Sequence, residues 1–202
     1  MIFIGVTGGI GSGKSTVCSM FEKKGTPVFY ADAVAKEISE GEALQEIADE
    51  FGTDIIDASK KLDRKKLAGI VFNDPGKLEI LNTIVHPRVF HSFQEWKHRD
   101  FGNSKFAIVE AALMFESGMF ELVDYVLAIV TEEDERVIRI SERDNTTVEQ
   151  IKARMKNQIS MEELLELSDF QIQNNGSVDE LTSKVNFFSI LFSTLQPPKE
   201  LE

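Results

Sequence analysis

The stretch Ile2-Phe-Ile-Gly-Val-Thr-Gly-Gly-Ile-Gly-Ser-Gly-Lys-Ser-Thr16 decides the fold of this 202-residue chain. Residues 2–6 are almost wholly apolar and predict a short buried strand, and apolar residues recur at helical spacing over residues 17–21. The glycine-rich segment between them fits the phosphate-loop pattern G-x-x-x-x-G-K-[ST]. A strand, a phosphate loop and a helix in this order predict a nucleotide-binding α/β protein.

The residue types in this loop explain why the pattern binds phosphate. Consecutive backbone N–H groups wrap the β-phosphate, and the following helix directs the positive end of its dipole at it. Lys14 reaches the β- and γ-phosphates, and the Ser15 hydroxyl contacts Mg²⁺. The alternative is a glycine-rich turn without a ligand.

Composition and charge limit the classes of partner. The net charge of −12 argues against nucleic acid, because binding a phosphate backbone requires a basic face. No apolar run in the sequence approaches the ~18 residues that a membrane span needs, and the first residues lack the pattern of a signal peptide. The single cysteine, Cys18, is expected to be a packed thiol, with a reactive thiol as the alternative. We expect a cytoplasmic protein with no membrane partner.

Short apolar runs alternate with longer helical patterns, which is typical of a parallel sheet with crossover helices on both faces. Five strands are predicted, at residues 2–6, 27–30, 106–110, 125–130 and 170–173. Capping boxes mark three helix starts, namely Thr146 with Glu149, Ser160 with Glu163, and Ser177 with Glu180.

A long segment with almost no strand signal separates the second and third strands. It predicts a helical insertion, with helices at 43–51, 64–72, 76–85 and 87–99, against which a second substrate would dock. Residues 132–158 are dense in charge and arginine and have the composition of a mobile lid. Residues 185–195 are apolar nearly all round and predict a buried helix on the sheet, with a membrane or partner helix as the alternative.

Candidate catalytic groups follow the predicted strands. Asp32 comes directly after the second strand, where an acid can accept the proton of an attacking hydroxyl; the alternative is an N-cap for a helix beginning at residue 33. Arg139 and Arg143 are four residues apart and share one helix face, and Arg154 lies on the next helix. Pointing inward they would neutralise a transferring phosphoryl group, and pointing outward they would pair with surface glutamates.

An ordered succession of motifs runs along nearly the whole chain. In chain order these are residues 6–16, Ala31-Asp32, Leu62-Asp63-Arg64, Val71-Phe72, His86-Pro87-Arg88-Val89, Leu113, Phe115-Glu116, Arg139, Arg143-Asp144, Arg154, Gln158, Ser168-Asp169-Phe170 and Asn174-Asn175-Gly176. From residue 1 to about residue 195, this succession resembles the dephospho-CoA kinase family. It is more specific than the phosphate loop alone, which shikimate and nucleoside monophosphate kinases share.

The resemblance implies an α/β, three-layer P-loop kinase with a five-stranded parallel sheet, a helical substrate-binding insertion and a helical lid. Residues 1–202 would form one domain, with the core at 1–32, 104–131 and 168–196, the CoA-binding insertion at about 33–103 and the lid at about 132–167. The implied reaction is ATP-dependent phosphorylation of the ribose 3′-hydroxyl of dephospho-CoA to give CoA and ADP. Mg²⁺ is the implied metal, and a monomer or weak homo-oligomer the implied assembly.

The resemblance also assigns roles to residues. Catalysis falls to Asp32, Lys14, Arg139 and Arg143. ATP binding falls to Gly11, Ser12, Gly13, Lys14, Ser15, Thr16 and Asn174. The metal falls to Ser15 and Glu110, and the acceptor to Arg64, His86 and Arg154. For His86 the alternative is that it only fixes a turn before Pro87.

Three departures from the family pattern concern the metal and acceptor sites and the lid. Tyr30 stands before Ala31-Asp32 where the family has an acid, and Glu110 and Ala112 replace an aspartate and a proline. In the lid, Arg136 stands where the family has glutamine. These changes put the surroundings of the metal and the floor of the acceptor site in question more than the class of reaction.

A GTPase is disfavoured because the chain has no Asn-Lys-x-Asp motif. Two other rival functions stay open on the sequence. Another P-loop kinase with a different small acceptor is the first rival, although residues 33–52 lack the arginine that a nucleoside monophosphate kinase would place there. A non-catalytic nucleotide-binding regulator is the second, and it would not need Asp32.

Overall fold

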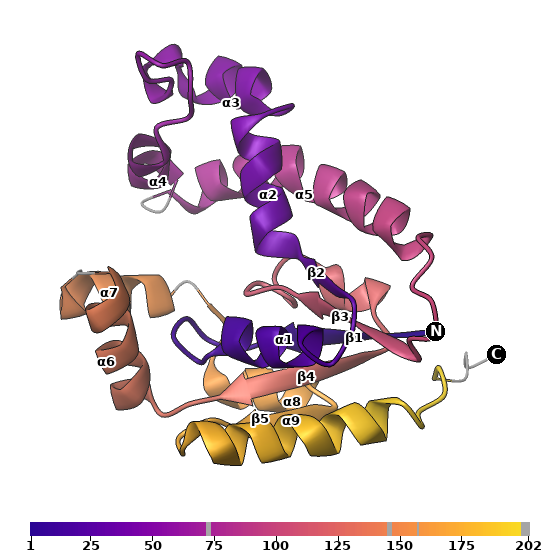
Figure 1. Ribbon diagram of the computed structural model, residues 1–202. Coiled ribbons are helices and arrows are strands. Elements are labelled where there is room, and N and C mark those ends of the chain that lie inside the picture. Colours follow the sequence, from indigo (N-terminus) through magenta and orange to yellow (C-terminus); the bar gives the residue numbers. More distant parts are fainter. Residues whose placement is uncertain (72–73, 145–146, 157, 199–202) are drawn as a thin grey trace. The chain divides into compact units, whose positions relative to one another are not determined.

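The structure of the protein is a computed structural model, and it describes residues 1–71, 74–144, 147–156 and 158–198. The chain divides into two compact units, Met1–Tyr30 with Asp100–Glu202, and Ala31–Arg99. The first unit carries the sheet and the phosphate loop, and the second is helical (Figure 1).

The first unit is built on a five-stranded parallel sheet in the order β2-β3-β1-β4-β5. The strands are β1 Ile2–Thr7, β2 Val28–Tyr30, β3 Phe106–Glu110, β4 Tyr125–Val130 and β5 Phe170–Gln173, so all five predicted strands are confirmed. The central strand β1 is fully buried, and its Val6 pairs with Glu110 on one side and Leu127 on the other. Ligands of open α/β sheets bind beyond the carboxyl ends of such strands.

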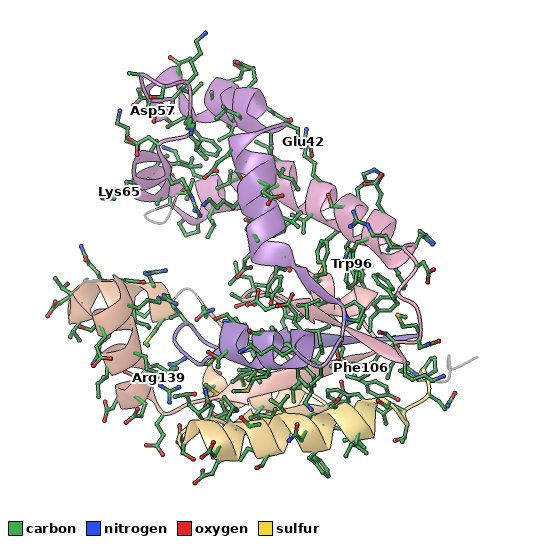
Figure 2. The ribbon with its side chains drawn as sticks, in the orientation of Figure 1. Glu42, Asp57, Lys65, Trp96, Phe106 and Arg139 are labelled. Atoms are coloured by element: carbon green, nitrogen blue, oxygen red, sulfur yellow. The ribbon has the colours of Figure 1, made fainter. Side chains whose placement is uncertain are left out.

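Helices α1 (Lys14–Glu22) and α9 (Val178–Phe192) share one core cluster with the sheet. Phe21 of α1, Phe106 of β3 and Phe192 of α9 meet ring to ring, with centroids 5.6 to 6.2 Å apart. Phe106 is labelled in Figure 2. Cys18 is fully buried in the same cluster, as expected of a packed thiol. Apolar burial at roughly 25 cal/mol per Å² makes such a cluster the main source of stability.

The last helix packs on the sheet as predicted, but it is only partly buried. Val185 and Phe192 of α9 are fully buried, but Phe187 and Ile190 are 62% and 71% exposed. A helix on one face of a sheet buries only the stripe that faces the strands, so apolar residues elsewhere on the helix stay in solvent.

Helix α8 (Met161–Leu167) belongs to a second, smaller cluster. Its Leu164 packs with Ala128 and Val130 of β4, so the last part of the predicted lid is attached to the sheet. The preceding helices, α6 (Glu133–Asp144) and α7 (Val148–Met155), contact each other. The division of the chain into core, insertion and lid stays a prediction.

Side-chain caps begin three of these helices. Ser160 and Ser177 accept hydrogen bonds from the backbone N–H groups of Glu163 and Glu180, as predicted. The first capping box is predicted one residue too early. Thr147 caps α7 and exchanges hydrogen bonds with Gln150, and Thr146 lies outside the described residues. Consecutive threonines offer the same side chain at both positions, so the pattern alone does not fix the cap.

The second unit contains α2 (Ala31–Glu40), α3 (Leu44–Phe51), the 3-10 turn η1 (Thr53–Ile55), α4 (Arg64–Val71) and α5 (Pro75–Lys97). The predicted break at His86 and Pro87 is wrong, since α5 runs through Pro87 as one helix. Proline removes a single backbone donor and can sit inside a helix that packing holds in place. Arg88 contributes to that packing by donating to the Ile84 carbonyl and to Glu46 of α3.

The helices of the described segments do not meet the length and polarity requirements of a membrane span. Each of them is too short or too polar to cross a bilayer.

Candidate active site

The predicted phosphate loop joins β1 to α1 in the first unit. Its turn is closed by a hydrogen bond of 3.0 Å from the Ser12 N–H to the Gly9 carbonyl, and α1 begins at Lys14. The Lys14 ammonium is almost fully buried and donates to the Gly8 carbonyl at 2.8 Å. The lysine therefore folds back over the start of the loop, where the terminal phosphates of a nucleotide would lie.

Glycine is needed at the end of this loop for two separate reasons. Gly13 caps α1 in the left-handed conformation, with φ 94°, which side chains with a Cβ rarely adopt. A Cβ at this position would also collide with the side-chain amide of Asn174. The loop is thus packed against the segment that follows β5.

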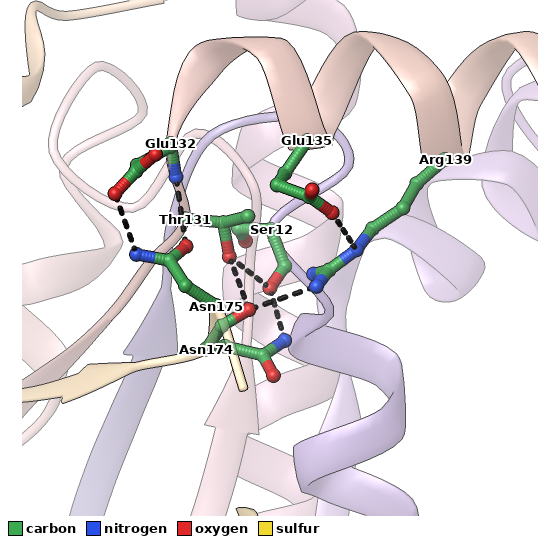
Figure 3. Close-up of polar contacts among 7 residues, drawn as sticks. All are labelled: Ser12, Thr131, Glu132, Glu135, Arg139, Asn174 and Asn175. Atoms are coloured by element: carbon green, nitrogen blue, oxygen red, sulfur yellow. Dashed lines mark hydrogen bonds and ion pairs between the residues drawn. The ribbon is translucent and has the colours of Figure 1, made fainter. Parts of the chain in front are cut away.

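Asn174 and Thr131 fasten the loop to the ends of β5 and β4 (Figure 3). The Asn174 amide donates to the Ser12 carbonyl at 2.8 Å, and the Thr131 hydroxyl donates to the same carbonyl at 3.0 Å. Both side chains are buried. Asn174, predicted to bind the nucleotide, here holds the backbone of the phosphate loop, and buried hydrogen bonds of this kind are costly to remove.

The arginines of the predicted lid have different partners. Arg139 donates to the Asn174 carbonyl at 2.9 Å and lies 4.0 Å from Glu135, so it sits beside the loop (Figure 3). Arg143 instead binds the Asp144 carboxylate at 2.6 Å, and Arg154 reaches the same carboxylate at 3.1 Å. The hydrogen bond from Arg143 lowers the pKa of Asp144 to about 2, and the one from Arg154 adds to this effect.

Two contacts of the loop were not predicted from the sequence. Gln158 accepts a hydrogen bond of 2.8 Å from the Ile10 N–H and donates to the Ala112 carbonyl at 3.3 Å, which links the loop to the segment after β3. Arg136 of α6 lies against Gly9. The sequence marks Gln158 as a motif position and Arg136 as a departure from the family, but its spacing does not reveal which side chains reach a loop.

The predicted metal ligands lie on neighbouring elements of the first unit. Ser15 is exposed in the first turn of α1, and Glu110 is buried at the end of β3. Burial raises the pKa of the Cys18 thiol, and the Glu110 carboxylate raises it further while Lys14 lowers it. Both charges therefore act close to the first turns of α1, where Ser15 is found.

Tyr30, which replaces an acid of the family pattern, is tied to α1. Its hydroxyl donates to Glu22 at 2.7 Å, and burial together with this hydrogen bond raises the pKa of Tyr30. The substitution therefore provides a structural contact at a position where the resemblance leads one to expect a second carboxylate.

The remaining predicted residues lie in the second unit. Asp32 is exposed in the first turn of α2, which begins at Ala31, so the expected helix start at residue 33 and the N-cap alternative are wrong. Arg64 is exposed at the start of α4. His86 is half-buried within α5 and stacks on Phe90, and burial lowers its pKa.

A phosphate loop at the end of the central strand, with a buried lysine and arginine-bearing helices beside it, defines an α/β P-loop kinase. The family model described as dephospho-CoA kinase matches residues 2–180, which is most of the chain. The chain belongs to the dephospho-CoA kinase family.

Individual relatives agree with this assignment. The chain is 42% identical over 187 residues to the dephospho-CoA kinase of Salinibacter ruber, covering 91% of this chain and 94% of the relative. It is 40% identical to that of Fusobacterium nucleatum, over 93% of this chain and 97% of the relative. Sequence identity at this level extends across both units.

Solved structures support the same fold. The crystal structure of TT1252 from Thermus thermophilus has a TM-score of 0.80 and 31% identity, covering 96% of this chain and 98% of the other. Dephospho-CoA kinase from Campylobacter jejuni has a TM-score of 0.68 and 31% identity, covering 95% and 96%. Shikimate kinase from Acinetobacter baumannii, with a TM-score of 0.52, 16% identity and coverage of 97% and 96%, shares the fold alone.

Proposed function

We propose that this chain transfers the γ-phosphoryl group of ATP to the ribose 3′-hydroxyl of dephospho-CoA, giving CoA and ADP, the last step of coenzyme A biosynthesis. The observation that carries the proposal is the phosphate loop with Lys14 folded over its start, in a chain of the dephospho-CoA kinase family. ATP and dephospho-CoA are its substrates.

The donor side of the reaction belongs to the first unit. The backbone N–H groups of Gly11, Ser12, Gly13, Lys14, Ser15 and Thr16 would hold the phosphates of ATP. Asn174 serves this site by fixing the Ser12 carbonyl and so the shape of the loop. Lys14 would exchange the Gly8 carbonyl for a phosphate oxygen.

Ser15 and Glu110 fit a magnesium ion. Their hydroxyl and carboxylate oxygens are hard donors, and Mg²⁺ in such sites takes most of its remaining ligands from water and phosphate. When bound, Mg²⁺ would offset charge on the β- and γ-phosphates. The burial of Glu110 keeps a carboxylate close to α1 without a cluster of further acids, since the described residues contain no group of three metal-binding side chains.

Asp32 would act as the general base. Its carboxylate takes the proton of the 3′-hydroxyl while that oxygen forms a bond to the γ-phosphorus and the bond to the β–γ bridging oxygen breaks. Lys14, Arg139 and Arg143 would stabilise the charge of the phosphoryl group in transfer. Arg64, His86 and Arg154 would hold dephospho-CoA.

The setting of the reaction is also part of the proposal. We expect the enzyme to work in the cytoplasm, as a monomer or weak homo-oligomer, with no nucleic-acid partner. Size-exclusion chromatography with light scattering would report the assembly directly.

The proposal is tested by an ADP-release assay with Mg-ATP, comparing dephospho-CoA with AMP, shikimate and no acceptor, and with CoA identified by mass. Asp32→Asn should lower kcat by roughly 100-fold or more, the size of a general-base contribution, while ATP binding is retained. Glu37→Gln is the matched control, because Glu37 is an exposed acid on the same helix α2.

The outcomes separate the rival functions. Turnover with another acceptor alone would keep the P-loop chemistry and move the substrate. Normal turnover in Asp32→Asn would remove the general-base assignment, and nucleotide binding without any phosphoryl transfer would favour a regulator.

A further inference from the structure

Arg136 of α6 is built into the surface of the phosphate loop. Its guanidinium occupies the space into which a side chain at Gly9 would project. The backbone approaches as well, since the Arg136 carbonyl lies 2.9 Å from the position of a Cβ on Gly11. Helix α6 therefore meets the loop at two successive glycines, with a cation at the contact.

The hydrogen-bonding capacity of this guanidinium is largely unused. Its Nε is buried without a hydrogen-bond partner among the described residues, and its Nη2 reaches only the Met155 sulfur, at 3.8 Å. Arg139, Arg143 and Arg154 all have oxygen partners. A partly buried cation with so few hydrogen bonds is unfavourable unless an anion completes it.

The position of Arg136 shows which end of a nucleotide it faces. Lys14 donates to Gly8, the residue before Gly9, and a phosphate-loop lysine reaches the β- and γ-phosphates. Arg139 lies at the other end of the loop, 4.0 Å from the position of a Cβ on Gly13. Arg136 and Lys14 thus share the terminal-phosphate end.

We propose that Arg136 is a further phosphate-binding residue of this enzyme and contacts the terminal phosphate of ATP. The proposal rests on the proposed function for the identity of the nucleotide. In the family pattern given above this position is a glutamine, which has no charge, so the contact is a property of this chain and not of the shared motif.

The chemistry of arginine suits this role. Burial lowers the pKa of Arg136, with Glu133 opposing the shift, yet a guanidinium stays protonated in proteins. It offers donors in a fixed planar arrangement that matches phosphate oxygens. A terminal phosphate would supply the acceptor that Nε lacks among the described residues, and would neutralise the partly buried charge.

The test is a comparison of two nucleotides by titration calorimetry without acceptor. Arg136→Met should weaken binding of a non-hydrolysable ATP analogue by about tenfold to a hundredfold, the range for a hydrogen bond to a charged group, and change ADP affinity by less than about twofold. Arg139→Met should weaken both nucleotides. Lys156→Met, which removes an exposed cation at the end of α7, is the control for net charge.

A second variant disrupts the contact between Arg136 and Gly9 by a substitution in the loop. Gly9→Ala places a methyl where the Arg136 guanidinium lies and should reproduce the selective loss of ATP-analogue affinity. Because both changes remove one contact, the double variant Gly9→Ala/Arg136→Met should lose no more than either single variant.

The results that would overturn the proposal are distinct from those that would overturn the function. Equal losses for ATP analogue and ADP in Arg136→Met, or no loss for either, would mean that Arg136 only supports the loop. If the wild-type protein bound both nucleotides but did not phosphorylate dephospho-CoA, the proposed function would fail while the selective loss still established Arg136. Failure of the wild type to bind either nucleotide would reject both.

Discussion

The two halves of helix α6 both carry arginine, but the surroundings of these arginines differ. At the amino-terminal end, Arg136 and Arg139 lie on the phosphate loop, and Ile140 is fully buried beside Gly11. At the carboxyl-terminal end, Arg143 is exposed and bound, together with Arg154, to Asp144. The amino-terminal half of helix α6 therefore lies against the phosphate loop, and its carboxyl-terminal half is a surface helix.

This difference divides the first helix of the predicted lid into two parts with different contacts. The amino-terminal half is fixed by contacts with glycine backbone, whereas the carboxyl-terminal half is held by exposed ion pairs that contribute little, about 0–1 kcal/mol each. In the proposed function Arg143 would reach a phosphate only by leaving Asp144. The loop end of α6 is thus preorganised, and the far end is held in an exchangeable pair.

We expect the largest effect from a substitution that disrupts the contact between the amino-terminal half of α6 and the phosphate loop. Gly11→Ala puts a methyl 2.9 Å from the Arg136 carbonyl and the Ile140 side chain, at a residue with φ 81°. The left-handed conformation alone costs roughly 1–2 kcal/mol, and displacing α6 should lower kcat/KM for ATP by about 100-fold. Urea unfolding and steady-state kinetics measure the two effects.

Gly25→Ala is the matched control for this substitution. Gly25 has φ 85° but nothing within 4 Å of its Cβ position. It should show the conformational cost without the kinetic loss. If both variants kept wild-type kinetics, contact with the loop would not fix the amino-terminal half of α6.

We expect a smaller effect, a gain and not a loss, from a substitution in the carboxyl-terminal half of α6. Asp144→Asn removes the carboxylate that binds Arg143 and Arg154, so both guanidinium groups become available to phosphate. ATP affinity should rise by up to about fivefold, corresponding to the roughly 1 kcal/mol of an exposed pair. Asp134→Asn, at an exposed acid in the first turn of the same helix, should leave affinity unchanged.

A loss of activity in Asp144→Asn would reverse this interpretation. It would mean that the ion pair with Asp144 holds Arg143 in the position that catalysis needs. Kinetics of Arg143→Met beside Asp144→Asn would then show losses of similar size and direction.

The sequence predicted the fold well because its signals are local. All five strands are short apolar runs, and the phosphate loop is defined by residues adjacent in the chain. The errors also have local causes. A proline weakens a helix in isolation, so the sequence predicts a break next to Pro87, but tertiary packing keeps α5 continuous through it.

The candidate site was harder to predict because its details depend on contacts between distant residues. The spacing of Arg139 and Arg143 placed them on one helix face, and could not reveal that one binds the Asn174 carbonyl and the other Asp144. The placement of Gln158 on the Ile10 N–H joins residues 148 positions apart. The assigned roles of the site residues remain predictions, and the substitutions above test them.

The smallest effect is the pH dependence of the Asp144 pair. Because the pKa of Asp144 is lowered to about 2 from its ordinary 3.8, the pair stabilises the folded state above pH 3.8, and this contribution is lost as the pH falls through about 2. The difference in unfolding free energy between wild type and Asp144→Asn should therefore be at most about 1 kcal/mol at pH 7 and shrink between pH 4 and pH 3. Urea unfolding at these three pH values measures it, with Asp134→Asn expected to show no such trend. A difference that stayed constant down to pH 3 would mean that Asp144 is not paired in solution, and the two ends of α6 would then differ only in their contact with the loop.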